Sequence, residues 1–403
     1  MGEPMHFSES IGRIKVSSTA AVVARADQLK ASGASLVDFG AGEPDFPTPE
    51  NIKRAAAAAL EANFTRYTPT GGIGDLKRAI VERHARDLGS NYKPEECVVT
   101  VGGKQAIFEA VAAVVNPGDE VILPVPYWTS FLDIIRYADG KPVLLPTREQ
   151  ERFAIWASDV ERLITPKTRL MIVNSPSNPT GAVVPNDEMQ KLLALAERRG
   201  FWLLADECYC HFLYDGRSPF SLGSSHNREN LIVVGSLSKT YAMTGWRAGF
   251  ALGPKELISN MVKLQSHSTS NVTSFVQRGA VEALSGPQDS VEAMRAEYER
   301  RRNRIVAGLR ALPGVECTMP GGAFYVYPNV QAYLTPDFDA NTLATRLLDE
   351  ALVAVVPGPA FGTAEHVRIS YAASIQQIEE GLARIGTFLA KIGAAHASAH
   401  VQA

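Results

Sequence analysis

Short apolar runs alternate along the chain with longer stretches of helical periodicity. The strand-like runs are mainly apolar on consecutive positions, as in strands covered on both faces, and lie at 98–101, 120–123, 170–173, 201–205, 231–234 and 248–252. Helical stretches lie between them at 105–115 and 187–199, the second with Asn186 at its N-cap position and Gly200 at its end. The alternation predicts an α/β fold with a mostly parallel central sheet flanked by helices.

The pattern changes near residue 290. A long charged helix over 291–310 contains three consecutive arginines at 300–302, which we interpret as a solvated helix face or an oligomer contact, and a further helix is predicted over 341–351. These features predict a smaller α+β domain. The predicted divisions are an N-terminal arm with part of the small domain, a large domain, the small C-terminal domain and a disordered tail, at 1–48, 49–290, 291–394 and 395–403.

Composition excludes several classes of protein. The chain of 403 residues has 40 Lys+Arg and 43 Asp+Glu, a formal net charge of −3, which is against nucleic-acid binding. Four cysteines in a chain of this size do not indicate a disulfide framework, and the lack of a C-x-x-C pair is against a zinc site or a redox dithiol. Cys208 and Cys210 are interpreted as small buried fillers. The polar N-terminus and the lack of an apolar run of about 18 residues predict a cytoplasmic protein without a membrane partner.

Polar clusters follow three of the predicted strands. They are Asn-Ser-Pro-Ser-Asn-Pro-Thr-Gly at 174–181, Asp-Glu-Cys-Tyr at 206–209 and Gly-Ser-Leu-Ser-Lys at 235–239. In a parallel sheet all three lie at the carboxyl edge, where open α/β folds bind ligands. The clusters therefore predict one binding site.

The residue types in these clusters indicate the chemistry. Gly102, Gly103 and Lys104 stand where a helix follows a strand, so they form either an ordinary turn or a phosphate cradle of backbone N–H groups, completed by Ser236, Ser238 and Arg247. A lysine in a partly desolvated site can form a Schiff base, a carboxylate can pair with a protonated ring nitrogen, and a nearby tyrosine can donate to a ring oxygen; the candidates are Lys239, Asp206 and Tyr209. Taken singly, these are an exposed lysine, a capping aspartate and a packed tyrosine. Together they predict pyridoxal phosphate.

The motifs resemble those of class I pyridoxal-phosphate-dependent aminotransferases, fold-type I enzymes. The segment SLSKTYAMTGWRAG at 236–249 is similar to the cofactor-attachment motif of that family, and NSPSNPTG at 174–181 and DECY at 206–209 are similar to two of its loops. GAGEPD at 40–45, YTPTGG at 67–72, PYW at 126–128 and HVRISYA at 366–372 fall in family order. The resemblance spans nearly the whole chain.

The resemblance implies a role for each matching residue. Lys239 would hold the cofactor as a Schiff base and move the proton, Asp206 would bind the pyridine nitrogen, and Tyr209 and Asn178 would bind the ring oxygen. The phosphate would be held by Gly103, Lys104, Ser236, Ser238 and Arg247, and by Tyr67 of the neighbouring subunit of a homodimer. The substrate carboxylate would be clamped by Arg368, assisted by Gly42, Asn178 and Trp128, the last of which also stacks near the cofactor.

The substrate expectation comes from the same resemblance. The sequence is similar to the bacterial aspartate aminotransferase subgroup, in which Lys104 would reach the distal carboxylate, and Lys15 either helps to close the site or is a solvated lysine. This implies ping-pong transfer between L-aspartate or L-glutamate and 2-oxo acids. The alternatives are an aminotransferase for prephenate or aromatic amino acids, a lyase of the same fold, or a ligand-sensing domain of a transcription regulator.

Overall fold

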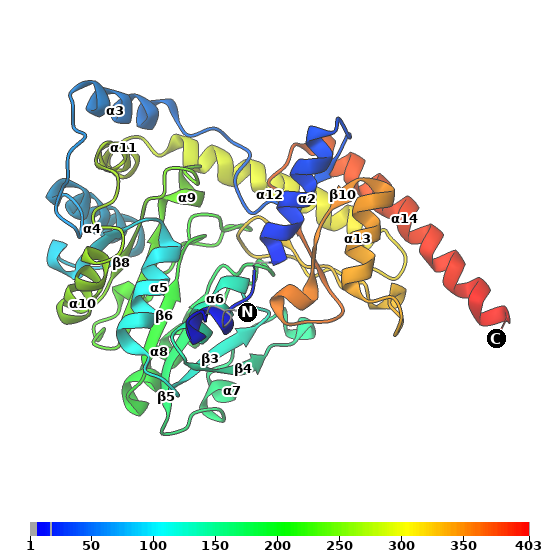
Figure 1. Cartoon of the computed structure of the whole chain (residues 1–403), viewed down its shortest axis with the longest axis horizontal. Coiled ribbons are helices and arrows are strands. Elements are labelled where there is room, and N and C mark those ends of the chain that lie inside the picture. The colour runs from blue at the N-terminus through cyan, green and yellow to red at the C-terminus, as the bar shows by residue number, and fades with distance from the viewer. Residues whose placement is uncertain (1–5, 17, 403) are drawn as a thin grey trace, which may run out of the picture.

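The computed structural model describes residues 6–16 and 18–402, and it has one large sheet with helices on both faces and a smaller part beside it (Figure 1). The sheet has the strand order β2-β8-β7-β6-β5-β3-β4. Its strands are β2 (Cys97–Thr100), β3 (Glu120–Val125), β4 (Lys141–Pro146), β5 (Thr168–Asn174), β6 (Trp202–Asp206), β7 (Leu231–Ser236) and β8 (Gly249–Leu252). Only β8 runs antiparallel to its neighbours in this sheet. The mostly parallel sheet that the sequence predicts is therefore confirmed.

Helices cover both faces of this sheet. They are α3 (Glu50–Glu61), α4 (Gly74–Leu88), α5 (Gly103–Val114), α6 (Thr129–Tyr137), α7 (Ala157–Glu161), α8 (Asn186–Arg199), α9 (Leu237–Thr240), α10 (Lys255–Ser266) and α11 (Ser274–Ser285). Leu203 and Ala205 of β6 join a core with α4, α8 and α11, while Leu204 joins the opposite core with α5, α6 and α10. Successive side chains of β6 thus alternate between two buried faces.

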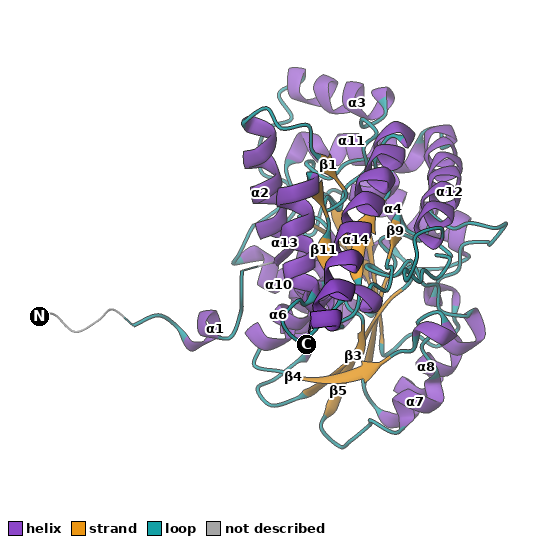
Figure 2. Cartoon of the chain, turned by 90° about the vertical axis from the view of Figure 1, so that its right-hand side faces the viewer, coloured by secondary structure: helices purple, strands orange, loops and turns teal. Residues whose placement is uncertain are grey.

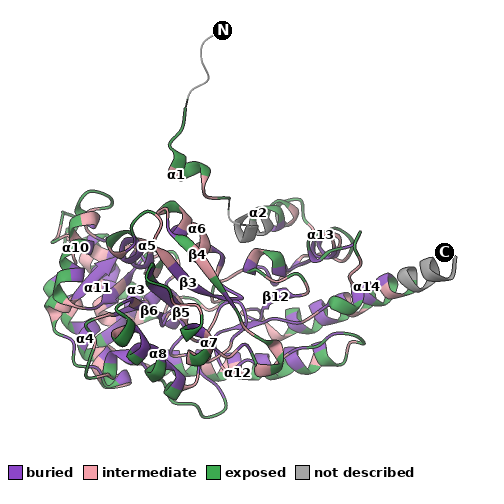
Figure 3. Ribbon diagram, turned by 90° about the horizontal axis from the view of Figure 1, so that it is seen from below, coloured by how far each residue is buried: buried purple, intermediate pink, exposed green. Residues whose placement is uncertain are grey.

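The smaller part has its own hydrophobic core, formed by α12 (Asp289–Arg310), α13 (Ala340–Ala351), α14 (Ile375–Gln402) and short strands. The strands are β1 (Val37–Asp38), β9 (Tyr325–Val326), β10 (Val353–Ala354), β11 (Val356–Pro357) and β12 (Val367–Ser370), and α2 (Ser18–Ala31) lies nearby. Figure 2 shows α1 (Glu9–Gly12) on an N-terminal segment that extends away from the body. Figure 3 shows that buried residues fill the sheet region and continue along the inner faces of α12 and α14.

The predicted strands and helices are all present, with boundary shifts of at most two residues. Two details differ. Asn186 is the first residue of α8 and Pro185 is its N-cap, whereas Gly200 ends this helix in the left-handed conformation, φ 76°, as expected. The strand β4 was not predicted, because Lys141–Pro146 has a proline next to its first residue and another at its end and lies at the edge of the sheet.

The interpretation of the arginine run at 300–302 as a solvated face is wrong for two of its members. Arg301 and Arg302 are buried, and they form ion pairs with Asp45 at 2.8 Å and Asp215 at 2.7 Å. The two guanidinium groups connect α12 to distant segments of the chain.

The helix α14 extends through residues 395–402, where we expected a disordered tail. The predicted domain boundaries stay predictions.

Candidate active site

A cavity of about 580 Å³ lies at the carboxyl ends of β5, β6 and β7, between the large sheet and the smaller part. Residues from both parts line it, including Tyr325 of β9 and Arg368 of β12. The lining residues that the sequence predicts are Gly42, Gly103, Lys104, Trp128, Asn178, Asp206, Tyr209, Ser236, Ser238, Lys239, Arg247 and Arg368. Folding thus brings together predicted site residues that lie up to 326 positions apart, the separation of Gly42 and Arg368.

Lys239 lies on α9, a single turn of helix that directly follows β7. The Ser236 hydroxyl caps this turn by accepting a hydrogen bond from the backbone N–H of Ser238 at 3.2 Å. The Lys239 ammonium group donates a hydrogen bond to the carbonyl oxygen of Gly42. Burial lowers the pKa of the Lys239 amine. The site therefore favours an amine that can lose its proton and act as a base or nucleophile.

Asp206 is the last residue of β6 and is buried. Its carboxylate accepts a hydrogen bond from the backbone N–H of Cys208 at 3.0 Å, and no cation in the part of the chain that the structure describes forms an ion pair with it. Burial raises the pKa of this carboxyl to about 7. A buried carboxyl of this kind suits a ligand that brings its own cationic N–H group.

One end of the cavity fits an anion. The backbone of Gly103 and the turn that begins α9 are close together, since a Cβ on Gly103 would lie 3.3 Å from the Cβ of Ser236. Gly102 has φ 78°, and a Cβ there would lie 2.7 Å from Nη2 of Arg247. Arg247 donates to the carbonyl oxygen of Thr244 at 2.9 Å, and no described carboxylate pairs with it. This end therefore offers an unneutralised guanidinium beside helix N-termini.

Arg368 lies buried at the other end. It donates to Asn178 Oδ1 at 3.1 Å and to the carbonyl oxygen of Gly40 at 2.7 Å, and its Nε has no described hydrogen-bond partner. Its guanidinium lies 4.7 Å from the ring centroid of Tyr325 and 5.2 Å from that of Phe361. A buried guanidinium without a carboxylate partner is suited to bind the carboxylate of a ligand.

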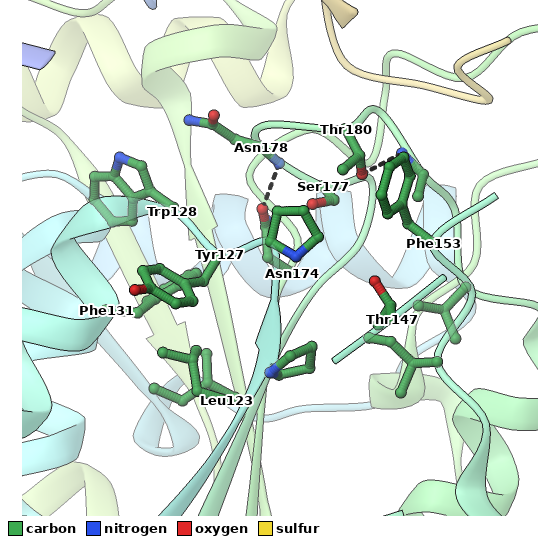
Figure 4. Close-up of a pocket in the computed structure, with 16 residues that line it drawn as sticks. Leu123, Tyr127, Trp128, Phe131, Thr147, Phe153, Asn174, Ser177, Asn178 and Thr180 are labelled. Atoms are coloured by element: carbon green, nitrogen blue, oxygen red, sulfur yellow. Dashed lines mark hydrogen bonds between the residues drawn. The ribbon is translucent and has the colours of Figure 1, made fainter. Parts of the chain in front are cut away.

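Trp128 and Asn178 also line the cavity. The Lys104 ammonium group lies 5.0 Å from the ring centroid of Trp128, and burial, with the nearby Arg247, lowers the pKa of Lys104. Figure 4 shows the backbone N–H of Asn178 bonded to Asn174 Oδ1, at 2.8 Å, with Trp128 nearby. Asn174 also donates to the carbonyl oxygen of Asp206 at 3.2 Å. The 174–181 loop is thereby tied to the strand that carries Asp206.

Two predicted residues do not line this cavity. Tyr67 is 92% exposed, and Lys15 lines a neighbouring open cavity together with Lys104 and Arg247. Tyr325 and Thr244 are among the lining residues that the sequence reasoning missed. The Tyr325 hydroxyl lies 2.9 Å from that of Tyr209, and Thr244 donates to Glu43 at 2.7 Å. The motif around Lys239 includes Thr244, but nothing near Tyr325 in the sequence marked that tyrosine as a site residue.

Comparisons with known proteins agree with this geometry. Residues 34–385 match the model of the family described as aminotransferase class I and II. The aspartate aminotransferase of Bacillus sp. (strain YM-2) is 42% identical over 377 residues, 93% of this chain and 96% of the relative. The aspartate/prephenate aminotransferase of Cereibacter sphaeroides is 42% identical over 395 residues, 95% and 98% of the two chains. The structure of the Thermus thermophilus aspartate aminotransferase with maleate has a TM-score of 0.91 at 42% identity, covering 96% and 100%.

The raised pKa of Asp206 predicts a pH-dependent loss of stability in the cofactor-free chain. Because the folded-state pKa of about 7 lies above the ordinary aspartate value of 3.8, the folded state is most favoured at low pH and loses stability as pH rises toward 7. Asp206→Asn removes this loss. In urea unfolding, the stability advantage of the variant over the unsubstituted chain should grow by about 2 kcal/mol between pH 5 and pH 7. A stability advantage of Asp206→Asn that is equal at pH 5 and pH 7 would contradict the raised pKa of Asp206.

Proposed function

The chain belongs to the class I and II aminotransferases, and we propose that it moves the amino group of L-aspartate or L-glutamate to 2-oxoglutarate or oxaloacetate with pyridoxal 5′-phosphate as cofactor. The observation that carries this proposal is the content of one cavity, which holds a buried carboxyl, an amine of lowered pKa, an anion-binding end and a buried guanidinium. Each of these groups matches one part of the cofactor or of an amino-acid substrate.

The residues present fit pyridoxal phosphate. Gly103 and Lys104 by their backbone, Ser236, Ser238 and Arg247 would hold its phosphate, and Asp206 would pair with its ring nitrogen. Burial raises the pKa of Tyr209 well above its ordinary value, so this phenol stays protonated and can donate to the ring oxygen, with Asn178 beside it. When bound, pyridoxal phosphate supplies an aldehyde for the amino group and a ring that takes up electrons.

Lys239 would attach the cofactor and move the proton. Its amine donates to the Gly42 carbonyl oxygen and lines the cavity, and its lowered pKa would let it take a proton from the substrate α-carbon and return it at the cofactor carbon. Trp128 would cover one side of the cofactor and exclude water. Because the first oxo acid would leave before the second oxo acid binds to the same residues, the kinetics would be ping-pong.

The substrate assignment depends on two cations. Arg368 would bind the α-carboxylate in a fork, and Lys104, beside Trp128, would face the distal carboxylate of a dicarboxylic substrate. The structure of the Thermus thermophilus aspartate aminotransferase with maleate, a dicarboxylate, supports a site for dicarboxylates. Lys15 lines the adjoining cavity with Lys104, so we propose that it adds positive charge from that side.

Prephenate is a second candidate substrate, which the similarity to the aspartate/prephenate aminotransferase of Cereibacter sphaeroides favours. Prephenate is a 2-oxo acid with a second carboxylate on its ring. The same pair, Arg368 and Lys104, would bind its two carboxylates if the open side of the cavity admits the ring.

We further propose that the protein is a cytoplasmic homodimer. Tyr67 is exposed on its own chain, and Arg247 lines both the main cavity and an adjoining open cavity of about 650 Å³, through which a tyrosine of a second copy could reach the phosphate. The four thiols are unpaired, which suits a reducing compartment. Sedimentation of the active holoenzyme at the 43.5 kDa mass of one chain would contradict the dimer.

Replacing Lys104 tests the substrate assignment. Lys104→Met keeps the backbone N–H and much of the side-chain volume but removes the charge that would face the distal carboxylate. We expect kcat/KM for L-aspartate to fall about 10- to 100-fold, the value of one charge-assisted hydrogen bond, while kcat/KM for L-alanine changes less than about threefold. Lys191→Met, an exposed lysine on α8, is the control. An equal loss with both amino acids would contradict the role of Lys104 in choosing the substrate.

A further inference from the structure

A buried histidine and a buried glutamate meet directly behind Asp206, outside the cavity that holds the predicted site residues. Nε2 of His84, on α4, lies 3.4 Å from Oε2 of Glu207, and the His84 and Glu207 side chains are 5% and 6% exposed. The other ring nitrogen of His84 lies 2.7 Å from the Ser90 hydroxyl. Glu207 Oε1 has no hydrogen-bond partner among the described residues.

The position of Glu207 follows from the alternation along β6. Ala205 faces the core that contains α4, and Asp206 turns to the opposite face, into the active-site cavity. Glu207 follows Asp206 and therefore returns to the α4 side, while its backbone N–H still donates to the carbonyl oxygen of Val234 at 2.9 Å. The peptide group that joins Asp206 to Glu207 is thus held between the cofactor site and His84.

Other charged groups nearby already have partners. Arg83 forms two hydrogen bonds with Asp87 one turn along α4, and His211 lies 3.8 Å from the same carboxylate. Arg228 lies over the ring of Tyr92, 4.0 Å from its centroid. The remaining titratable groups that line this region are Cys210 and Tyr241. In the part of the chain that the structure describes, His84 is the only cation-forming side chain that pairs with Glu207.

We propose that His84 and Glu207 form a positioning pair of zero net charge. The pair holds Asp206 in place and cancels the second negative charge, that of Glu207, which would otherwise lie next to the Asp206 carboxyl. An unpaired buried carboxylate is costly, and His84 is the group placed to neutralise it. Without that neutralisation, the negative charge of Glu207, placed behind Asp206, would favour the protonated forms of the ring nitrogen and of the Lys239 nitrogen. This inference rests on the proposed cofactor and deepens the account of how its electronic state is set.

The test follows the visible absorption of the resting holoenzyme without substrate as pH is raised. His84→Gln leaves the Glu207 carboxylate without its cation, and the added negative charge favours the protonated form of the bound cofactor. We expect the apparent pKa of the spectral change to rise by roughly half a unit to one unit. The double variant H84Q/E207Q restores zero net charge and should return this pKa to within about 0.2 units of the unsubstituted enzyme.

The matched control is Glu188→Gln, which alters another buried carboxylate of the large part, on α8, and should leave the spectral pKa unchanged. If His84→Gln alone does not fold, the test uses the double variant H84Q/E207Q. The spectrum of this double variant should match that of the unsubstituted enzyme. A shift in the double variant, or none in His84→Gln, would overturn the pairing. Absence of any cofactor band in the unsubstituted protein would instead contradict the proposed function.

Discussion

The site depends on burying a carboxyl, an amine and a guanidinium in one cavity without neutralising them against one another. Asp206, Lys239 and Arg368 all line this cavity, and no ion pair joins any two of them in the described structure. Each group has its pKa shifted toward its neutral form by burial. Such an arrangement is costly for an empty protein, and ligands that carry complementary charges lower that cost when they bind.

The fold holds the three groups in place by carrying each of them on a different strand or strand end. Asp206 and Lys239 follow neighbouring parallel strands, whose ends are fixed by backbone hydrogen bonds and by cores on both faces. Arg368 comes from β12 in the smaller part, where its own core holds the neighbouring residues of the strand. The cavity therefore exists only where the two parts meet. On α12 of the smaller part, the buried Arg301 and Arg302 tie that helix to Asp45 and Asp215 by ion pairs.

Much of this arrangement could be predicted from the sequence because each strand and the site residues at its end are close together in the sequence. Each apolar run ends in its own polar cluster, so the strands, their carboxyl edge and residues such as Asp206 and Lys239 follow from short windows. What could not be predicted depends on contacts between distant segments. Tyr325 meets Tyr209 across 116 positions, and Glu207 meets His84 across 123. The burial of Arg302 likewise depends on Asp215, 87 positions away. Tyr67 and Lys15 lie outside the main cavity of the single chain, and their roles stay proposals.

The most direct test is a rapid-mixing absorbance measurement on the purified holoenzyme with single amino acids and no oxo acid. The account predicts a visible band from the cofactor bound to Lys239, bleached fastest by L-aspartate and L-glutamate and restored by 2-oxoglutarate. It also predicts no such band in Lys239→Ala. Bleaching by aromatic or aliphatic amino acids alone would contradict the dicarboxylate assignment, and steady release of ammonia without an oxo acid would indicate a lyase. A protein that forms no band with added pyridoxal phosphate would contradict the account as a whole.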